Sequence, residues 1–148
     1  MSAPKSAYPS VWATRLGYGG LIPFVVLALA TWMADPAYRA FSGLSLLGYG
    51  AAIASFLGAI HWGLVMRDPS HQSHAVLVWG VVPSLGAWLA LMLGPVPGLF
   101  VIAGLLLACF AVDRVVYPGL QVRGWLPMRL LLTLVASASC VAGAVGML

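Results

Sequence analysis

Long apolar stretches separated by short polar breaks dominate the pattern of this sequence. Each stretch is close to the roughly 20 residues that a membrane-spanning helix needs. Prolines lie in several of the breaks, and proline disfavours helix in the residue before it. The pattern predicts an all-α integral membrane bundle of five transmembrane helices at residues 16–34, 41–66, 75–93, 99–117 and 127–148. Residues 1–15 are expected to form a cytoplasmic tail, and residues 16–148 a single domain.

The breaks differ in polarity, and this difference indicates how far each leaves the bilayer. Residues 67–74 form the most polar stretch of the chain and predict a solvated loop. Residues 94–98 read Gly-Pro-Val-Pro-Gly and carry no charge, which predicts a tight turn between the third and fourth helices.

Composition excludes a water-soluble fold. Hydrophobic residues make up 62% of the chain and charged residues 7%, with a mean hydropathy of +1.02. An ordinary soluble domain carries about 25% charged residues. The formal net charge is +4, but the basic residues are scattered between apolar spans and form no run that favours nucleic acid. We expect anionic membrane lipids to be their partners.

The basic residues are distributed unequally across the predicted membrane. Of the seven Lys and Arg residues, only Arg39 falls on one side, and the other six fall on the opposite side: Lys5, Arg15, Arg67, Arg114, Arg123 and Arg129. Because Lys and Arg are retained in the cytoplasm, the bias predicts an N-in, C-out topology. We expect a multi-pass protein of the bacterial inner (cytoplasmic) membrane.

Small residues recur every four positions along the second predicted span, on two faces of the helix. One face carries Gly50, Ala54 and Gly58, and the other carries Ala51, Ser55, Ala59 and Gly63. Such faces let helix backbones approach closely within a membrane. We therefore expect this helix at the centre of the bundle, and a bulky residue at Gly58 to be more disruptive than one at Gly94.

His61 is the outstanding polar residue, because an ionisable side chain inside a span is costly and marks a functional hypothesis. It lies about as far from the end of the second span as Asp113 lies from the end of the fourth. At a rise of 1.5 Å per residue, both lie about 6–8 Å below the same membrane surface. We predict that His61 and Asp113 share a polar cluster. Arg15, Arg114 and Arg129 lie near enough in depth to compete for Asp113.

Several roles for this cluster remain open at this stage: a structural cross-brace, a ligand or quinone-headgroup site, a proton relay, or a haem or metal site. The ligand hypothesis uses His61, Trp62, Asp113, Arg129 and Tyr49, with His61 donating a hydrogen bond and an aromatic ring stacking. No metal site is predicted and the cofactor stays unassigned, because the other histidines, His71 and His74, fall in the polar loop without an evident third ligand.

Three segments together resemble a bacterial and mitochondrial family of membrane proteins. They read Leu16-Gly17-x-x-Gly20-x-Ile22-Pro23-Phe24, Tyr49-x-x-x-Ile53-x-Ser55-Phe56-Leu57-Gly58-x-Ile60-His61-Trp62-Gly63 and Pro83-Ser84-Leu85-x-x-Trp88. They resemble domain-of-unknown-function family 3429, the transmembrane protein 69-like membrane proteins. The resemblance implies a compact multi-span protein and transfers no activity, but it places His61 and Trp62 inside the most specific motif.

The sequence favours a non-enzymatic accessory, assembly or scaffold component that binds lipid or partner helices. It contains no nucleotide-binding loop, nucleophile elbow or zinc-protease helix, and no catalytic residue is assigned. A proton-coupled transporter working as a dimer, with Pro23, Pro83 and His61 lining a path, is one alternative. A quinone-binding redox accessory protein is the other. A homo-oligomer or a larger membrane complex is compatible with each of these.

Overall fold

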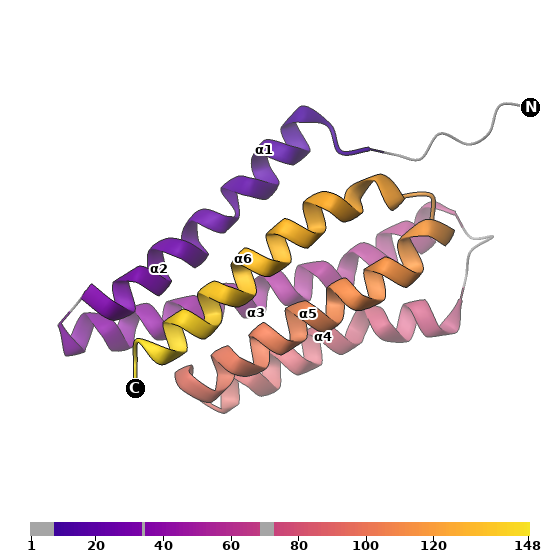
Figure 1. Cartoon of the computed structure of the whole chain (residues 1–148). Helices are drawn as coiled ribbons and strands as arrows, with labels where there is room; N and C mark the ends of the chain where they lie inside the picture. The colour runs from indigo at the N-terminus through magenta and orange to yellow at the C-terminus, as the bar shows by residue number, and fades with distance from the viewer. Residues whose placement is uncertain (1–7, 34, 69–72) are drawn as a thin grey trace, which may run out of the picture.

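A computed structural model describes residues 8–33, 35–68 and 73–148 of the chain. The described residues form α1 (Val11–Gly19), α2 (Leu21–Met33), α3 (Pro36–Arg67), α4 (His74–Met92), α5 (Pro95–Gly119), the 3₁₀ helix η2 (Arg123–Trp125) and α6 (Leu126–Val145). α1 and α2 follow one another almost in line, so the elements form a bundle of five rods (Figure 1). The prediction of an all-α protein is confirmed.

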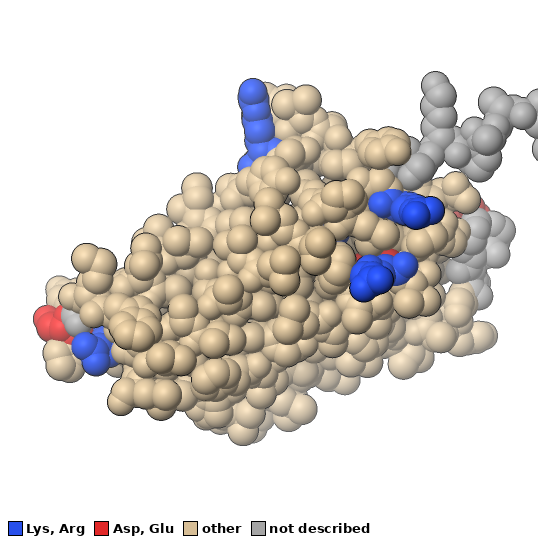
Figure 2. Space-filling view, in the orientation of Figure 1, with Lys and Arg blue, Asp and Glu red and all other residues tan. Residues whose placement is uncertain are grey.

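Five helical segments within the described ranges are long and apolar enough to cross a membrane. They are Val11–Met33, Pro36–Arg67, His74–Met92, Pro95–Gly119 and Arg123–Val145. Large apolar side chains remain exposed on the outer faces, including Leu29, Phe41 and Trp88. Charged side chains are few on the face drawn in Figure 2, and a broad surface without charge separates those at its left end from those at its upper edge and toward its right end. The molecule is a multi-pass membrane protein.

Several helix boundaries differ from the predicted ones, and local chemistry explains the differences. α1 begins at Val11 rather than Leu16, because Ser10 caps it by accepting a hydrogen bond from the backbone of Ala13 at 3.2 Å. α3 begins at Pro36 rather than near residue 41, since the Asp35 carboxylate caps its first turn. Residues 1–7 of the predicted tail lie outside the described residues, and residues 11–15 of that tail belong to α1.

The tight turn predicted between the third and fourth spans is confirmed, but it is shorter than the five residues expected. α5 already begins at Pro95, and Gly94 reverses the chain with φ of 82° and ψ of 176°. Only glycine adopts this backbone conformation without strain. Since proline is favoured at the first position of a helix, the reversal needs no further residues.

The first predicted span is not one continuous helix. It breaks at Gly20, between α1 and α2. Pro23 lies at the third position of α2 and has no N–H to donate to the carbonyl four residues earlier. No residue of α1 is buried. α1 therefore packs less closely on the bundle than the helices that follow it.

α3 is central, as predicted, and contacts α2, α4, α5 and α6. On the first small-residue face, a Cβ atom at Gly58 would clash with the backbone carbonyl of Gly80 in α4. A Cβ atom at Gly50 would lie 2.8 Å from Ile102 of α5. The second predicted face packs only in part, because Ala59 is exposed and a Cβ atom at Gly63 would meet open space.

Candidate functional site

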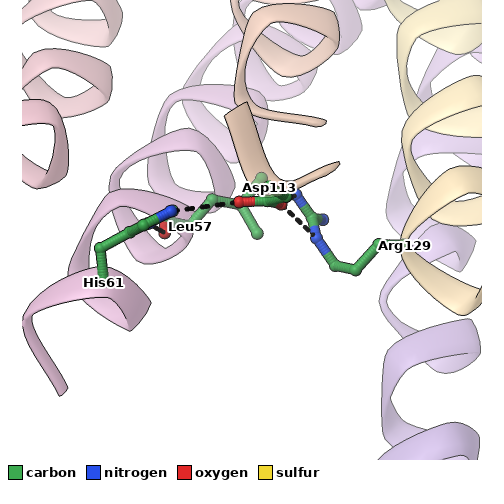
Figure 3. Close-up of polar contacts among 4 residues, drawn as sticks. All are labelled: Leu57, His61, Asp113 and Arg129. Carbon is green, nitrogen blue, oxygen red and sulfur yellow. Dashed lines mark hydrogen bonds and ion pairs between the residues drawn. The ribbon is translucent and has the colours of Figure 1, made fainter. Parts of the chain in front are cut away.

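A buried polar triad joins three helices of the bundle. His61 comes from α3, Asp113 from α5 and Arg129 from α6. The side chains of the three residues point toward one another, with Asp113 in the middle (Figure 3). Their exposed fractions are 1% for His61, 1% for Asp113 and 6% for Arg129. The predicted contact between His61 and Asp113 is therefore confirmed, and the third member of the cluster is Arg129.

The strongest contact in the triad is the ion pair between Asp113 and Arg129. Arg129 donates to Oδ2 of Asp113 from Nε at 2.9 Å and from Nη2 at 2.7 Å. Hydrogen bonds between two charged groups are short and about twice as strong as neutral ones. The carboxylate and the guanidinium thus compensate each other's charge inside the bundle, as buried charges require.

His61 contacts the pair more weakly than the sequence suggested. Its Nε2 lies 3.3 Å from Oδ1 of Asp113, but this contact does not have the geometry of a hydrogen bond. Its Nδ1 lies 3.3 Å from the carbonyl oxygen of Leu57, one turn earlier in α3. Both oxygens only accept hydrogen bonds, and a neutral imidazole has a single N–H. A neutral His61 can therefore donate to only one of them.

Tyr117 also lies beside the triad, and the sequence did not lead us to expect it there. Its ring centroid lies 6.0 Å from that of His61, and its exposed fraction is 3%. It follows Asp113 by four residues in α5, so both side chains face the same side of that helix. This spacing was a signal in the sequence that could have identified it.

Trp62 and Tyr49 do not join the triad, although both were candidates for the same ligand site. Trp62 points toward α4, where its indole Nε1 donates to the carbonyl of Leu77 at 3.0 Å. The Tyr49 ring packs against Phe24, and its hydroxyl donates to the carbonyl of Gly20 at 2.9 Å. The structure thus divides the five candidate residues into the triad and two separate helix contacts.

The Tyr49 contact leads to a test of its structural role. Replacing Tyr49 with phenylalanine removes the hydrogen bond at the break between α1 and α2, so we expect the free energy of unfolding to fall by about 0.5–1.5 kcal/mol. An unfolding titration with sodium dodecyl sulfate in mixed micelles measures this change. An unchanged free energy of unfolding would show that the bond contributes nothing to stability.

Metal-binding chemistry finds no support in the described part of the chain, where no three His, Cys, Asp or Glu side chains gather. His74 is the first residue of α4, whereas His71 lies outside the described residues. Cys109 and Cys140 are buried free thiols. The triad itself offers one carboxylate, one imidazole and a guanidinium that is already bound to the carboxylate.

Comparison with known proteins identifies the family but no activity. The chain is similar to transmembrane protein 69 of Xenopus tropicalis, with 38% identity over 82 residues. That match covers 54% of this chain, and it spans about a third, 32%, of the length of the relative. No solved structure matches the chain. Residues 10–145 match the family model described as protein of unknown function (DUF3429), and the chain therefore belongs to this family.

Proposed function

We propose that the protein is a non-enzymatic accessory or scaffold component of a membrane, which acts by binding lipid or partner helices. One observation carries this proposal: the side chains of His61, Asp113 and Arg129 are buried inside the bundle and contact one another. Since the triad links α3, α5 and α6, its simplest role is a structural brace. A brace fixes the relative positions of three helices and leaves their outer faces available.

The transporter alternative has no specific observation in its favour. A cavity of about 610 Å³ lies among α1, α2, α3, α5 and α6, but the described residues that line it do not include Pro23, Pro83 or His61. Pro83 is instead buried beside Gly58, where α4 crosses α3. A shared path through these three residues is therefore not supported.

The quinone alternative placed His61 as the headgroup donor, with Trp62 or Tyr49 stacking on the ring. Trp62 and Tyr49 bind other helices, as described above, and His61 is 1% exposed. The three side chains do not surround a common space.

Proton flux across vesicles separates the proposed role from transport. We expect vesicles that contain the protein and a trapped pH-sensitive dye to lose an imposed pH gradient no faster than protein-free vesicles. His61→Leu should leave that rate unchanged. Faster decay that depends on the protein and disappears in His61→Leu would establish a proton path and overturn the proposal.

We also propose the N-in, C-out orientation in the bacterial cytoplasmic membrane, which the six-to-one bias of basic residues supports. The C-terminus lies at the end of the bundle where α3 begins, beside the predicted outer side (Figure 1). We expect an alkaline phosphatase fusion at Leu148 to be active and a fluorescent protein fusion there to be dark. The reverse pattern would place the C-terminus in the cytoplasm.

A further inference from the structure

The cavity beside the triad is a feature of the fold that the brace does not explain. Its volume of about 610 Å³ falls within the range of sites that enclose a small molecule. α1 diverges from α6 toward its N-terminal end, and the cavity lies between these helices and α3 (Figure 1). Most of its wall is apolar, including Leu21, Phe24, Ile53, Leu106 and Ala136.

One wall of the cavity carries hydrogen-bond donors. Arg129 and Thr133 lie one turn apart on α6, and both line the cavity together with Tyr117. The guanidinium of Arg129 has five N–H groups, of which two donate to Asp113. The hydroxyl of Thr133 is buried and has no hydrogen-bond partner among the described residues. A buried hydroxyl without a partner is destabilising, so its presence points to an acceptor supplied from outside the chain.

The polar groups follow an order along the cavity. Arg67 is the last residue of α3, so it lines the cavity at the end of that span. Arg129 lies in the first turns of α6, and Thr133 follows about 6 Å deeper, since four residues rise by that distance. The walls beyond Thr133 are apolar, with Phe24 and Ala136. From the end of α3 inward, the cavity therefore presents the cation of Arg67, the guanidinium of Arg129 that is paired with Asp113, the hydroxyl of Thr133 and then an apolar wall.

The cavity is accessible from the side, where lipid would surround the bundle. At its rim, Leu16 of α1 is 73% exposed and Phe56 of α3 is 63% exposed, whereas Thr133 at its base is 2% exposed. A molecule can therefore enter the cavity from the bilayer between α1 and α3, and a part of it that does not fit can remain outside.

We propose that this cavity binds an anionic phospholipid, with its phosphate between Arg67 and Arg129, an ester carbonyl at Thr133 and one acyl chain along the apolar wall. The inference deepens the proposed lipid-binding role by naming the lipid class. Arg67 supplies a positive charge that favours a charged phosphate over a neutral headgroup, and Arg129, whose charge Asp113 compensates, supplies N–H donors to the phosphate. A quinone has acceptors but no charge, and a fatty acid has no acceptor group apart from its carboxylate that could reach Thr133 while the carboxylate stays near the arginines.

Spin-label spectroscopy tests the proposal on the full chain reconstituted in phosphatidylcholine vesicles. The fraction of motionally restricted label gives the relative affinity for spin-labelled phosphatidylglycerol and spin-labelled phosphatidylcholine. Because Arg67, whose charge no acidic side chain of the described residues compensates, contributes about 1 kcal/mol, we expect phosphatidylglycerol to be preferred about fivefold. Equal restriction of the two lipids would overturn the proposal.

Two variants, each with a matched control, locate the site. Arg67→Gln should lower the preference for phosphatidylglycerol about threefold or more, while Arg114→Gln, an exposed arginine outside this cavity, should not change it. Thr133→Val removes the unpaired hydroxyl with little change of shape and should weaken binding of phosphatidylglycerol about threefold to tenfold. Thr31→Val, whose buried hydroxyl already donates to Ala28, should leave lipid binding unchanged.

The outcomes separate this proposal from the proposed function. Equal effects of the target variants and their controls would remove the phospholipid site. Displacement of the labelled lipid by ubiquinone, but not by unlabelled phosphatidylglycerol, would show a quinone in its place. Neither of these results affects the proton-flux test of the proposed function. Proton flux, if it is found, does not by itself contradict the phospholipid site. Far-UV circular dichroism confirms that each variant is folded.

Discussion

Replacing Asp113 with leucine is expected to lower the free energy of unfolding by about 3–5 kcal/mol, because the change leaves Arg129 charged, buried and unpaired. In the native triad, Arg129 donates two hydrogen bonds to this one carboxylate. Among the described residues, Asp113 is the acidic side chain that forms an ion pair with Arg129. An unfolding titration with sodium dodecyl sulfate measures the loss.

Restoring an apolar interior should recover most of that stability. We expect the double variant Asp113→Leu/Arg129→Met to unfold within about 1–2 kcal/mol of the native protein, since replacing a buried ion pair with apolar residues is often nearly neutral. The matched control is Asp113→Leu/Arg114→Met, in which an exposed neighbour is changed and no recovery is expected. Equal stability of the two double variants would refute the ion-pair brace.

The same geometry decides the outcome of a double-mutant cycle between His61 and Asp113. Matching depth alone predicts that replacing both residues with leucine is nearly neutral for stability. In the structure, that exchange leaves Arg129 without its partner. The coupling energy of Asp113 should therefore be larger with Arg129 than with His61, and the pair of cycles measures the difference directly.

The depth of a residue along its helix could be predicted from the sequence, whereas the direction in which its side chain points around the helix axis could not. The position of a residue along a straight helix follows from a constant rise per residue, and this places His61 level with Asp113. The choice among Arg15, Arg114 and Arg129 depends on how each helix is turned toward its neighbours. Arg114 follows Asp113 directly and so points about 100° away from it, which is why it is exposed.

The two aromatic candidates show the same limit. Trp62 is adjacent to His61 in the sequence, and this adjacency turns it about 100° around α3 toward α4. Tyr49 lies 12 positions before His61, or about 18 Å along the helix axis. The helical geometry alone argued against placing all three around one ligand. Thr133, in contrast, stands four residues after Arg129, and that spacing could have identified the shared wall of the cavity.

Introducing a methyl group at Gly58 is expected to destabilise the protein by about 1–3 kcal/mol, and the same change at Gly63 by less than about 0.5 kcal/mol. Both glycines lie in α3, so Gly→Ala brings the same gain in helix propensity at each position. The difference between them therefore reports packing alone.

The packing at Gly58 is unusually restrictive. An added Cβ atom would overlap the backbone oxygen of Gly80 and lie 3.3 Å from Pro83, whereas at Gly63 it would meet nothing within 4 Å. Backbone atoms cannot rotate away as a flexible side chain can, so α4 must move as a whole. Gly94 is a poorer comparison than its place in a turn suggests, since its φ of 82° makes any side chain there costly. Titrations of Gly58→Ala and Gly63→Ala in the same mixed micelles measure the contrast, and equal stability of the two variants would contradict the close crossing of α3 and α4.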